Sequence, residues 1–163
     1  MELIVFVGLQ ASGKSTLFRE RFAGTYQHVS KDLFPHNRNK NRRQEQLLHA
    51  ALSASRSVVV DNTNPTPEDR QPLVRLGHEH GAKVLGYFFE ASVRGCLRRN
   101  EMPEGKARVP DVAIYATAKK LVETLHRGGF RRAYLRTAER LRLRGPRMLR
   151  EGTRRDNGRS REL

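Results

Sequence analysis

The stretch GLQASGKST, residues 8–16, constrains the fold of this chain more than any other. It matches the pattern G-x-x-x-x-G-K-[ST] at Gly8, Gly13, Lys14 and Ser15. An apolar run that predicts a strand precedes it, and a stretch that predicts a short helix follows it. The glycines let the backbone turn its N–H groups inward, and a helix N-terminus favours bound phosphate. The loop therefore predicts a phosphate-binding cradle.

The polar residues of this cradle have predicted tasks. Lys14 is expected to reach the β and γ phosphates of ATP, and Ser15 to offer its hydroxyl to Mg²⁺. A glycine loop with a purely structural role is the alternative, and the strand and helix on the correct sides argue against it. The full set of loop residues expected to contact the nucleotide is Gly8, Ala11, Ser12, Gly13, Lys14, Ser15 and Thr16.

Apolar runs and helical patterns alternate along the chain. Strands are predicted at residues 3–7, 26–30, 57–60, 83–89 and 130–135, and helices at 15–22, 42–55, 67–80, 93–99 and 111–125. Thr66 and Asp69 predict a capping box, Pro72 is expected to disturb the first turns of that helix, and Gly81 is expected to end it. Strands separated by helices indicate an α/β fold of three layers, with a central, mostly parallel sheet flanked by helices and a small lid.

Length and charge predict one domain and a basic tail. The net charge is +15, and residues 127–163 hold 13 arginines against 4 acidic residues, a net charge of +9. We expect a single domain over residues 1–136 and an arginine-rich, partly disordered tail over 137–163. Two roles for the tail stay open: contact with nucleic-acid phosphates that weakens as salt rises, or a solvated end without a partner.

Several classes of protein are disfavoured by composition. Cys96 is the single cysteine, so an internal disulfide and a cysteine-based zinc site are excluded. No apolar run is long enough to span a bilayer, and the first residues do not follow the pattern of a secretory leader. We therefore expect a cytoplasmic protein with no membrane contact and no obligate protein partner.

Two acidic residues are predicted at strand tips near the cradle. Asp61 directly follows an apolar strand, the position of an acid that holds Mg²⁺ beside the Ser15 hydroxyl; an ordinary turn-forming aspartate is the alternative. Asp32 follows the second strand, where a carboxylate could orient an acceptor hydroxyl and take its proton. From the residues alone, a simple helix cap at Asp32 is equally consistent.

A switch GTPase is not indicated. Such a protein needs a D-x-x-G element after a long strand and an N-K-x-D motif that reads the base. The strand at 57–60 is followed by DNTN, and NKNR at 39–42 has arginine in place of the aspartate. A phosphoryl-transfer enzyme with a small acceptor-binding core remains.

The order and spacing of five motifs resemble one family. GLQASGKST, HVSKD, VVVDNTNP, LRRNEMPEGKARVP and GGFRRAYL, within residues 2–136, are similar to the kinase domain of polynucleotide 5′-hydroxyl kinases, which includes bifunctional kinase/phosphatase repair enzymes. The resemblance implies that Asp32 is the general base toward the 5′-hydroxyl. Lys31 stands where the family has arginine, so a planar fork is replaced by a point charge. No D-x-D-x-[TV] phosphatase motif occurs in the sequence.

The resemblance also implies basic contacts to both substrates. The loop RRNEMPEGKARVP resembles a lid whose arginine closes over the ATP phosphates. Its candidates are Arg98, Arg99 and Arg108, with Arg99 favoured and an exposed helix end as the alternative. Arg38, Arg42 and Arg43 are candidate acceptor-phosphate contacts, with a solvated helix face as the alternative.

These expectations converge on an ATP- and Mg²⁺-dependent kinase whose acceptor is the 5′-hydroxyl of DNA or RNA. Two alternatives stay open. One is a P-loop kinase acting on a nucleoside, sugar or antibiotic hydroxyl. The other is a nucleic-acid-binding protein whose ATP site regulates binding through the arginine-rich tail.

Overall fold

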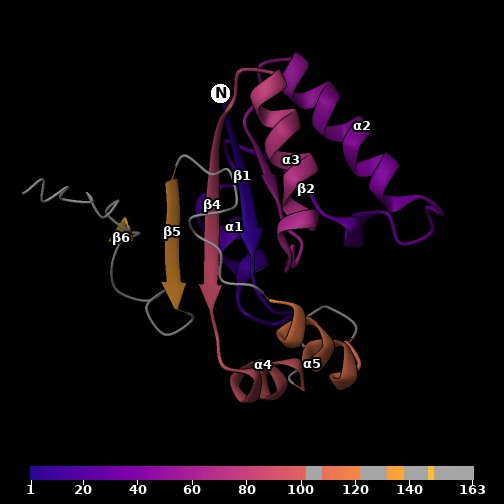
Figure 1. Cartoon of the computed structure of the whole chain (residues 1–163), viewed down its shortest axis with the longest axis vertical. Helices are drawn as coiled ribbons and strands as arrows, with labels where there is room; N and C mark the ends of the chain where they lie inside the picture. Colours follow the sequence, from indigo (N-terminus) through magenta and orange to yellow (C-terminus); the bar gives the residue numbers. More distant parts are fainter. Residues whose placement is uncertain (102–107, 122–131, 138–146, 149–163) are drawn as a thin grey trace, which may run out of the picture.

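A six-stranded sheet forms the centre of this computed structural model (Figure 1). The structure describes residues 1–101, 108–121, 132–137 and 147–148. The strands are β1 (Glu2–Val7), β2 (Gln27–Val29), β3 (Val58–Val60), β4 (Lys83–Glu90), β5 (Arg132–Thr137) and β6 (Arg147–Met148). Their order in the sheet is β2-β3-β1-β4-β5-β6. Strands β1 to β5 are parallel to one another, and β6 is antiparallel to β5.

Helices cover both faces of this sheet. They are α1 (Lys14–Arg21), α2 (Lys40–Ser53), α3 (Pro67–Glu79), α4 (Val93–Asn100) and α5 (Asp111–Lys120), with a short 3₁₀ helix, η1 (Lys31–Leu33). α2 and α3 lie against one face and α1 against the other, while α4 and α5 lie beyond the carboxyl ends of the strands (Figure 1). The predicted three-layer α/β fold is confirmed.

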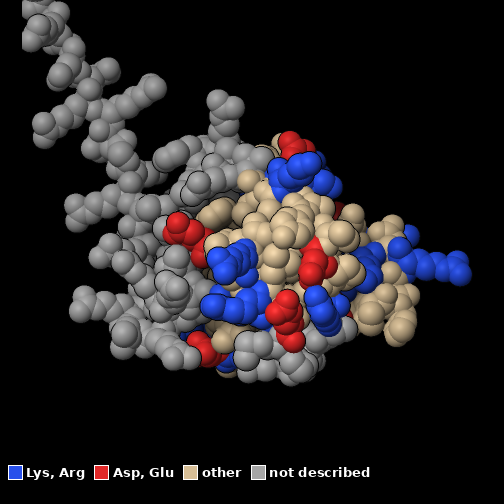
Figure 2. All heavy atoms as spheres, turned by 90° about the horizontal axis from the view of Figure 1, so that it is seen from below, with Lys and Arg blue, Asp and Glu red and all other residues tan. Residues whose placement is uncertain are grey.

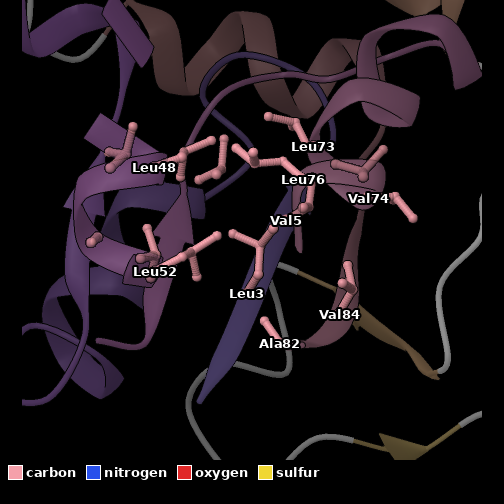
Figure 3. Close-up of a cluster of buried hydrophobic side chains, with 14 of the residues drawn as sticks. Leu3, Val5, Leu48, Leu52, Leu73, Val74, Leu76, Ala82 and Val84 are labelled. Atoms are coloured by element: carbon pink, nitrogen blue, oxygen red, sulfur yellow. The ribbon is translucent and has the colours of Figure 1, made fainter. Parts of the chain in front are cut away.

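Alternation along the strands divides the core into two layers. On β1, Leu3 and Val5 pack toward α2 and α3, and Figure 3 shows them among Leu48, Leu52 and Leu73. Ile4 and Phe6, between them in sequence, pack toward α1 on the opposite face. Because both faces are covered, residues Leu3 to Val7 of this strand include no polar side chain and appear in the sequence as one continuous apolar run.

Helix α3 approaches the sheet closely at a glycine. A Cβ atom added to Gly77 would lie 2.6 Å from Val84 Cγ2 and 2.9 Å from Leu3 Cδ2. Real Cβ atoms do not approach other carbon atoms this closely, so the missing side chain sets the distance between the helix and strands β1 and β4.

The boundaries of α3 follow the sequence signals. Thr66 Oγ1 accepts a hydrogen bond from the Asp69 backbone N–H at 3.3 Å, and Asp69 Oδ2 accepts one from the Thr66 N–H at 3.1 Å. Gly81 follows the last residues of the helix with φ +67°, the left-handed conformation that favours glycine. The capping box and the terminating glycine are therefore confirmed.

Contrary to the prediction, Pro72 does not disturb α3. The helix is continuous from Pro67 to Glu79 with Pro72 inside it. The N–H that proline lacks would have bonded to the carbonyl of Glu68, an exposed residue in the first turn. Water can replace that bond there, so the helix continues.

Larger differences from the prediction lie in the C-terminal part of the described chain. α5 ends at Lys120 rather than at residue 125, because Leu121 leaves the helical conformation and packs against the core. β5 continues to Thr137, one residue past the expected domain boundary. Arg147–Met148, within the segment predicted as a tail, pairs with β5. The remainder of that segment lies outside the described residues.

Among the described residues, no helix has the length and apolar character needed to cross a bilayer.

Candidate active site

The carboxyl ends of β1, β2 and β3 meet at one edge of the sheet. In Figure 1 this edge faces α4 and α5, and the loop from β1 into α1 runs along it. Ligands of open parallel sheets bind beyond this edge, because loops from neighbouring strands converge there. The candidate site is therefore built from segments that lie far apart in the sequence: those that follow β1, β2 and β3, and helix α4.

The loop between β1 and α1 depends on glycine at its two ends. Gly8 has φ +154°, and a Cβ atom there would lie 2.8 Å from Phe89 Cβ on β4. Gly13 has φ +95° and directly precedes the first residue of α1. Ala11, between them, also has a positive φ of 54°. The loop thus takes a backbone course that requires glycine at both pattern positions.

The Lys14 side chain lies buried within this loop. Its ammonium donates hydrogen bonds to the carbonyl oxygens of Gly8, at 3.1 Å, and Leu9, and it lies 3.3 Å from Ser12 Oγ. Thr16, the last predicted contact of the loop, is exposed on the first turn of α1. The structure thus places Gly8, Leu9 and Ser12 around one buried positive charge, whereas Thr16 lies on the surface.

The segment after β3 supports the loop from behind. The Gly8 N–H donates to the Thr63 carbonyl at 3.0 Å, and Asn64 Nδ2 donates to the Phe6 carbonyl at 2.8 Å. Arg70, buried on α3, donates through Nη1 to the carbonyl of Asn64 at 3.0 Å. The sequence interpretation of VVVDNTNP did not identify this role of Asn64, which joins the tips of β1 and β3.

Asp61 lies where β3 ends and faces the start of α1. Its carboxylate oxygen Oδ2 accepts a hydrogen bond from Ser15 Oγ at 2.7 Å and one from His28 Nε2 at 3.1 Å. Burial raises the pKa of Asp61, but the hydrogen bonds from His28 and Ser15 and the charge of Lys14 outweigh it and lower the pKa below its ordinary value. Asp61 is therefore a buried, ionised carboxylate beside the Ser15 hydroxyl.

His28 is a site residue that the sequence interpretation missed. It lies on β2, and its ring stacks on Phe18 of α1 with centroids 3.9 Å apart and planes 14° from parallel. Strand alternation carried a partial signal, because Val29 packs toward α2 and α3 and its neighbour must face α1. The pairing with Asp61 depends on the register between β2 and β3, which one sequence does not reveal.

Asp32 lies in η1, immediately beyond β2, and its side chain is exposed. Ser30 caps this turn, since its Oγ accepts from the Asp32 N–H at 3.4 Å. The Lys31 N–H donates to Asn62 Oδ1 at 3.0 Å, and Asn62 Nδ2 donates to Gln44 Oε1 of α2 at 2.6 Å. Asn62 thus ties the segment that carries Asp32 to the tip of β3 and to α2.

The three arginines predicted for the lid occupy different surroundings. Arg99, on α4, donates through Nε to the carbonyl of Ala11 at 2.7 Å, so it contacts the loop directly. Arg98 is exposed on the same helix, and Arg108 forms an exposed ion pair with Asp111 at 3.3 Å. Of the three, the structure places Arg99 at the loop.

Helices α4 and α5 are attached to the loop by apolar and polar contacts. Leu9 of the loop packs with Cys96 of α4 and Ile114 of α5, and Gln10 Nε2 donates to Thr117 Oγ1 of α5 at 2.9 Å. Figure 2 shows the molecule from this end, where the basic and acidic side chains of the described residues are interspersed. Among the described residues, this view therefore shows no large patch of a single charge sign.

The residues at this edge fit a magnesium ion that is held mainly by phosphate oxygens. Among the described residues, no group of three or more His, Cys, Asp or Glu side chains could hold a metal alone. Mg²⁺ commonly uses one or two protein oxygens together with waters and substrate phosphates. Ser15 Oγ and the ionised Asp61 supply oxygens of the required kind.

Comparison with known proteins identifies the family. The model of the AAA_33 family, described as an AAA domain, matches residues 3–127. The chain belongs to the AAA_33 family. This match spans the loop, both acidic strand tips and the helices of the predicted lid.

Individual relatives of this AAA_33 domain agree with that assignment. The chain is 35% identical over 120 residues to the bifunctional polynucleotide phosphatase/kinase of Schizosaccharomyces pombe. The matched region covers 69% of the chain but only 28% of that relative's length. A gluconokinase from Sinorhizobium meliloti has the same fold, with a TM-score of 0.60, 17% identity and 82% of each chain covered. Kti12 of Chaetomium thermophilum, solved with ADP-AlF3, also has a TM-score of 0.60, at 19% identity with 83% and 88% covered. The AAA_33 domain described here is thus a P-loop kinase-like protein.

Proposed function

We propose that this chain transfers the γ-phosphoryl group of ATP to the 5′-hydroxyl of a polynucleotide. The observation that carries the proposal is the arrangement at the carboxyl edge of the sheet. There the loop around Lys14 and the ionised Asp61 beside Ser15 lie on adjacent strands, and a further acid, Asp32, follows the outer strand. A phosphoryl-transfer site needs a phosphate cradle, a metal-binding acid and a carboxylate near the acceptor.

Each residue of the site has a proposed role that follows from its position. Lys14 exchanges the carbonyl oxygens of its own loop for the β and γ phosphates of ATP, and Arg99 adds a second positive charge from α4. Ser15 and Asp61 would hold Mg²⁺, which neutralises charge on the transferred group when it is bound. Asp32 orients the acceptor hydroxyl and accepts its proton. Catalysis in this scheme is positioning together with charge neutralisation.

The charge around Asp32 favours a polyanionic acceptor over a neutral sugar. Residues 31–43 contain five cations and Asp32 as the single acid: Lys31, Arg38, Lys40, Arg42 and Arg43. None of these five forms an ion pair with another described residue. Unpaired cations near an acceptor site suit the phosphates that flank a nucleic-acid end. The polynucleotide phosphatase/kinase relative supports the same class of acceptor.

Labelled ATP tests the proposal directly. The purified chain is incubated with ATP labelled in the γ-phosphate and a panel of acceptors: DNA and RNA oligonucleotides with a 5′-hydroxyl, the same oligonucleotides with a 5′-phosphate, mononucleosides and simple sugars. We expect label in the 5′-hydroxyl oligonucleotides and none in their 5′-phosphorylated counterparts. Label confined to nucleosides or sugars would assign the chain to small-molecule kinases instead. Binding of oligonucleotides without any transfer would favour an ATP-regulated binding protein.

A further inference from the structure

The structure assigns His28 as the positioning residue that fixes the Asp61 carboxylate for a magnesium–nucleotide complex. The inference rests on the proposed nucleotide site, and it concerns how that site is held in shape before its ligands arrive. His28 is hydrogen-bonded to Asp61 and stacks on Phe18. It acts through Asp61, which its Nε2 atom reaches at 3.1 Å.

Hydrogen-bond chemistry fixes the direction of this contact. An ionised carboxylate can only accept hydrogen bonds, so in this contact His28 donates through the N–H of Nε2. The Asp61 side chain is only 2% exposed, and a carboxylate buried to this degree requires donors to compensate for lost water. His28 and Ser15 supply two donors to the same oxygen, Oδ2.

This arrangement leaves the other carboxylate oxygen available. Asp61 Oδ1 accepts no hydrogen bond from any described residue. With Oδ2 held from two sides, the carboxylate plane is fixed, and Oδ1 can contact a cation or its bound water. Partners of this kind orient metal-binding carboxylates in many proteins and hold them ready for the ion.

His28 is held in place from α1, the helix that carries Ser15. Its ring stacks on Phe18, which lies one helical turn after Ser15 and therefore on the same side of the helix. One imidazole thus connects β2, β3 and α1 at the site. The Asp61 N–H, which donates to the Val29 carbonyl at 2.9 Å, closes the same junction through the backbone.

Two substitutions separate the hydrogen bond from the stacking. His28→Phe keeps a ring for Phe18 but has no N–H donor, whereas His28→Gln keeps an N–H donor and removes the ring. The measurement is the Mg²⁺ concentration that gives half-maximal binding of a fluorescent, non-hydrolysable ATP analogue, with binding in EDTA as the metal-free reference. No acceptor is present, so the result does not depend on the proposed polynucleotide substrate.

We expect His28→Phe to need about tenfold more Mg²⁺ than the wild type, with its metal-free affinity unchanged. His28→Gln is expected to stay within about threefold of the wild type because the donor is restored. Thermal unfolding checks that both variants fold, and His28→Met, which also lacks a donor, replaces His28→Phe if that variant does not.

Three results would overturn the inference: an unchanged Mg²⁺ midpoint in His28→Phe, equal shifts in the Phe and Gln variants, or a parallel loss of metal-free affinity. The inference and the proposed function can fail independently. A shifted Mg²⁺ midpoint in a protein that phosphorylates no oligonucleotide would support the role of His28 and contradict the proposed acceptor. Transfer to 5′-hydroxyl ends with an unchanged midpoint would support the proposed acceptor and contradict the role of His28.

Discussion

Asp61 illustrates how one buried charge is kept at the tip of a strand. Its carboxylate is almost fully removed from water, yet hydrogen bonds from His28 and Ser15 and the nearby Lys14 charge hold its pKa below the ordinary value. Two segments of the chain, β2 and the start of α1, supply these groups. The lowered pKa of Asp61 is therefore a product of the folded arrangement, and the pKa returns to its ordinary value when the chain unfolds.

This difference predicts how stability depends on pH. Because the pKa of Asp61 is lower in the folded chain than its ordinary value of 3.8, the unfolded chain takes up this proton first as the pH falls. The contribution of Asp61 is fully present above the unfolded pKa and is lost as the pH falls through the folded pKa. We expect the free energy of unfolding to fall more steeply between about pH 5 and about pH 3 in the wild type than in Asp61→Asn.

Urea unfolding followed by circular dichroism at a series of pH values makes this measurement. Glu20→Gln, which removes an exposed carboxylate of α1, is the matched control and should follow the wild type. Parallel curves for the wild type and Asp61→Asn would show that the carboxylate is not stabilised in the folded chain.

Single residues of the site differ in how well a sequence can predict them. Gly8, Gly13, Lys14 and Ser15 belong to one contiguous loop, so local spacing was sufficient to group them. His28 was not predicted, because its contact with Asp61 crosses two strands, and neither the register nor the stacking partner is encoded locally. The bridge from Asn62 to Gln44 was missed for the same reason.

Among the secondary-structure elements, α3 shows how a single missing side chain sets packing. Gly77 faces β1 and β4, and an added Cβ atom would lie within 2.9 Å of Leu3 and 2.6 Å of Val84. Both neighbours are buried in the core shown in Figure 3 and cannot move into solvent. The position of α3 matters to the site because its Arg70 holds the loop after β3.

Gly77→Ala should therefore destabilise the chain. Alanine is favoured over glycine in a helix by about 1 kcal/mol, but forcing a methyl group into a filled core costs about 1–3 kcal/mol. We expect a net loss of about 1 kcal/mol in the free energy of unfolding, measured by urea titration. Gly24→Ala is the matched control, because nothing lies within 4 Å of its added Cβ atom. Equal stability of the two variants would contradict the tight packing of α3.

The elements that the sequence predicted best have strong local signals at their ends. The capping box at Thr66 and the glycine at position 81 gave the limits of α3, and Ser92 accepts from the Gly95 N–H at 3.1 Å to begin α4. Where the end depends on packing, prediction failed: Leu121 ends α5 by turning toward the core, although helical spacing continued beyond it. The pairing of β6 with β5 is a long-range contact that no local pattern encodes.

In the whole molecule, the parallel sheet gathers groups that are distant in sequence. β1 contributes the loop with Lys14, β2 contributes His28 and leads into Asp32, and β3 contributes Asp61. Arg99 reaches the loop from α4. The sequence predicted that the loop, Asp32 and Asp61 meet at one edge because parallel strands place their carboxyl ends there, but it did not predict His28. The role of the basic segment 137–163 stays a prediction, since most of it lies outside the described residues.

Asp32 is the group whose loss should separate binding from chemistry. It lies beyond β2 and outside the loop that holds Lys14, so its removal leaves the nucleotide cradle intact. In Asp32→Asn the amide keeps the shape of the side chain but cannot take the proton from the hydroxyl that is phosphorylated. Glu45→Gln, which neutralises an exposed acid on α2, is the matched control.

The decisive measurement is transfer of the labelled γ-phosphoryl group to a 5′-hydroxyl oligonucleotide by Asp32→Asn, with ATP affinity determined on the same preparation. We expect the transfer rate to fall by roughly 100-fold or more, with ATP affinity near that of the wild type and Glu45→Gln fully active. Transfer at the wild-type rate in Asp32→Asn would contradict the mechanism proposed for this site.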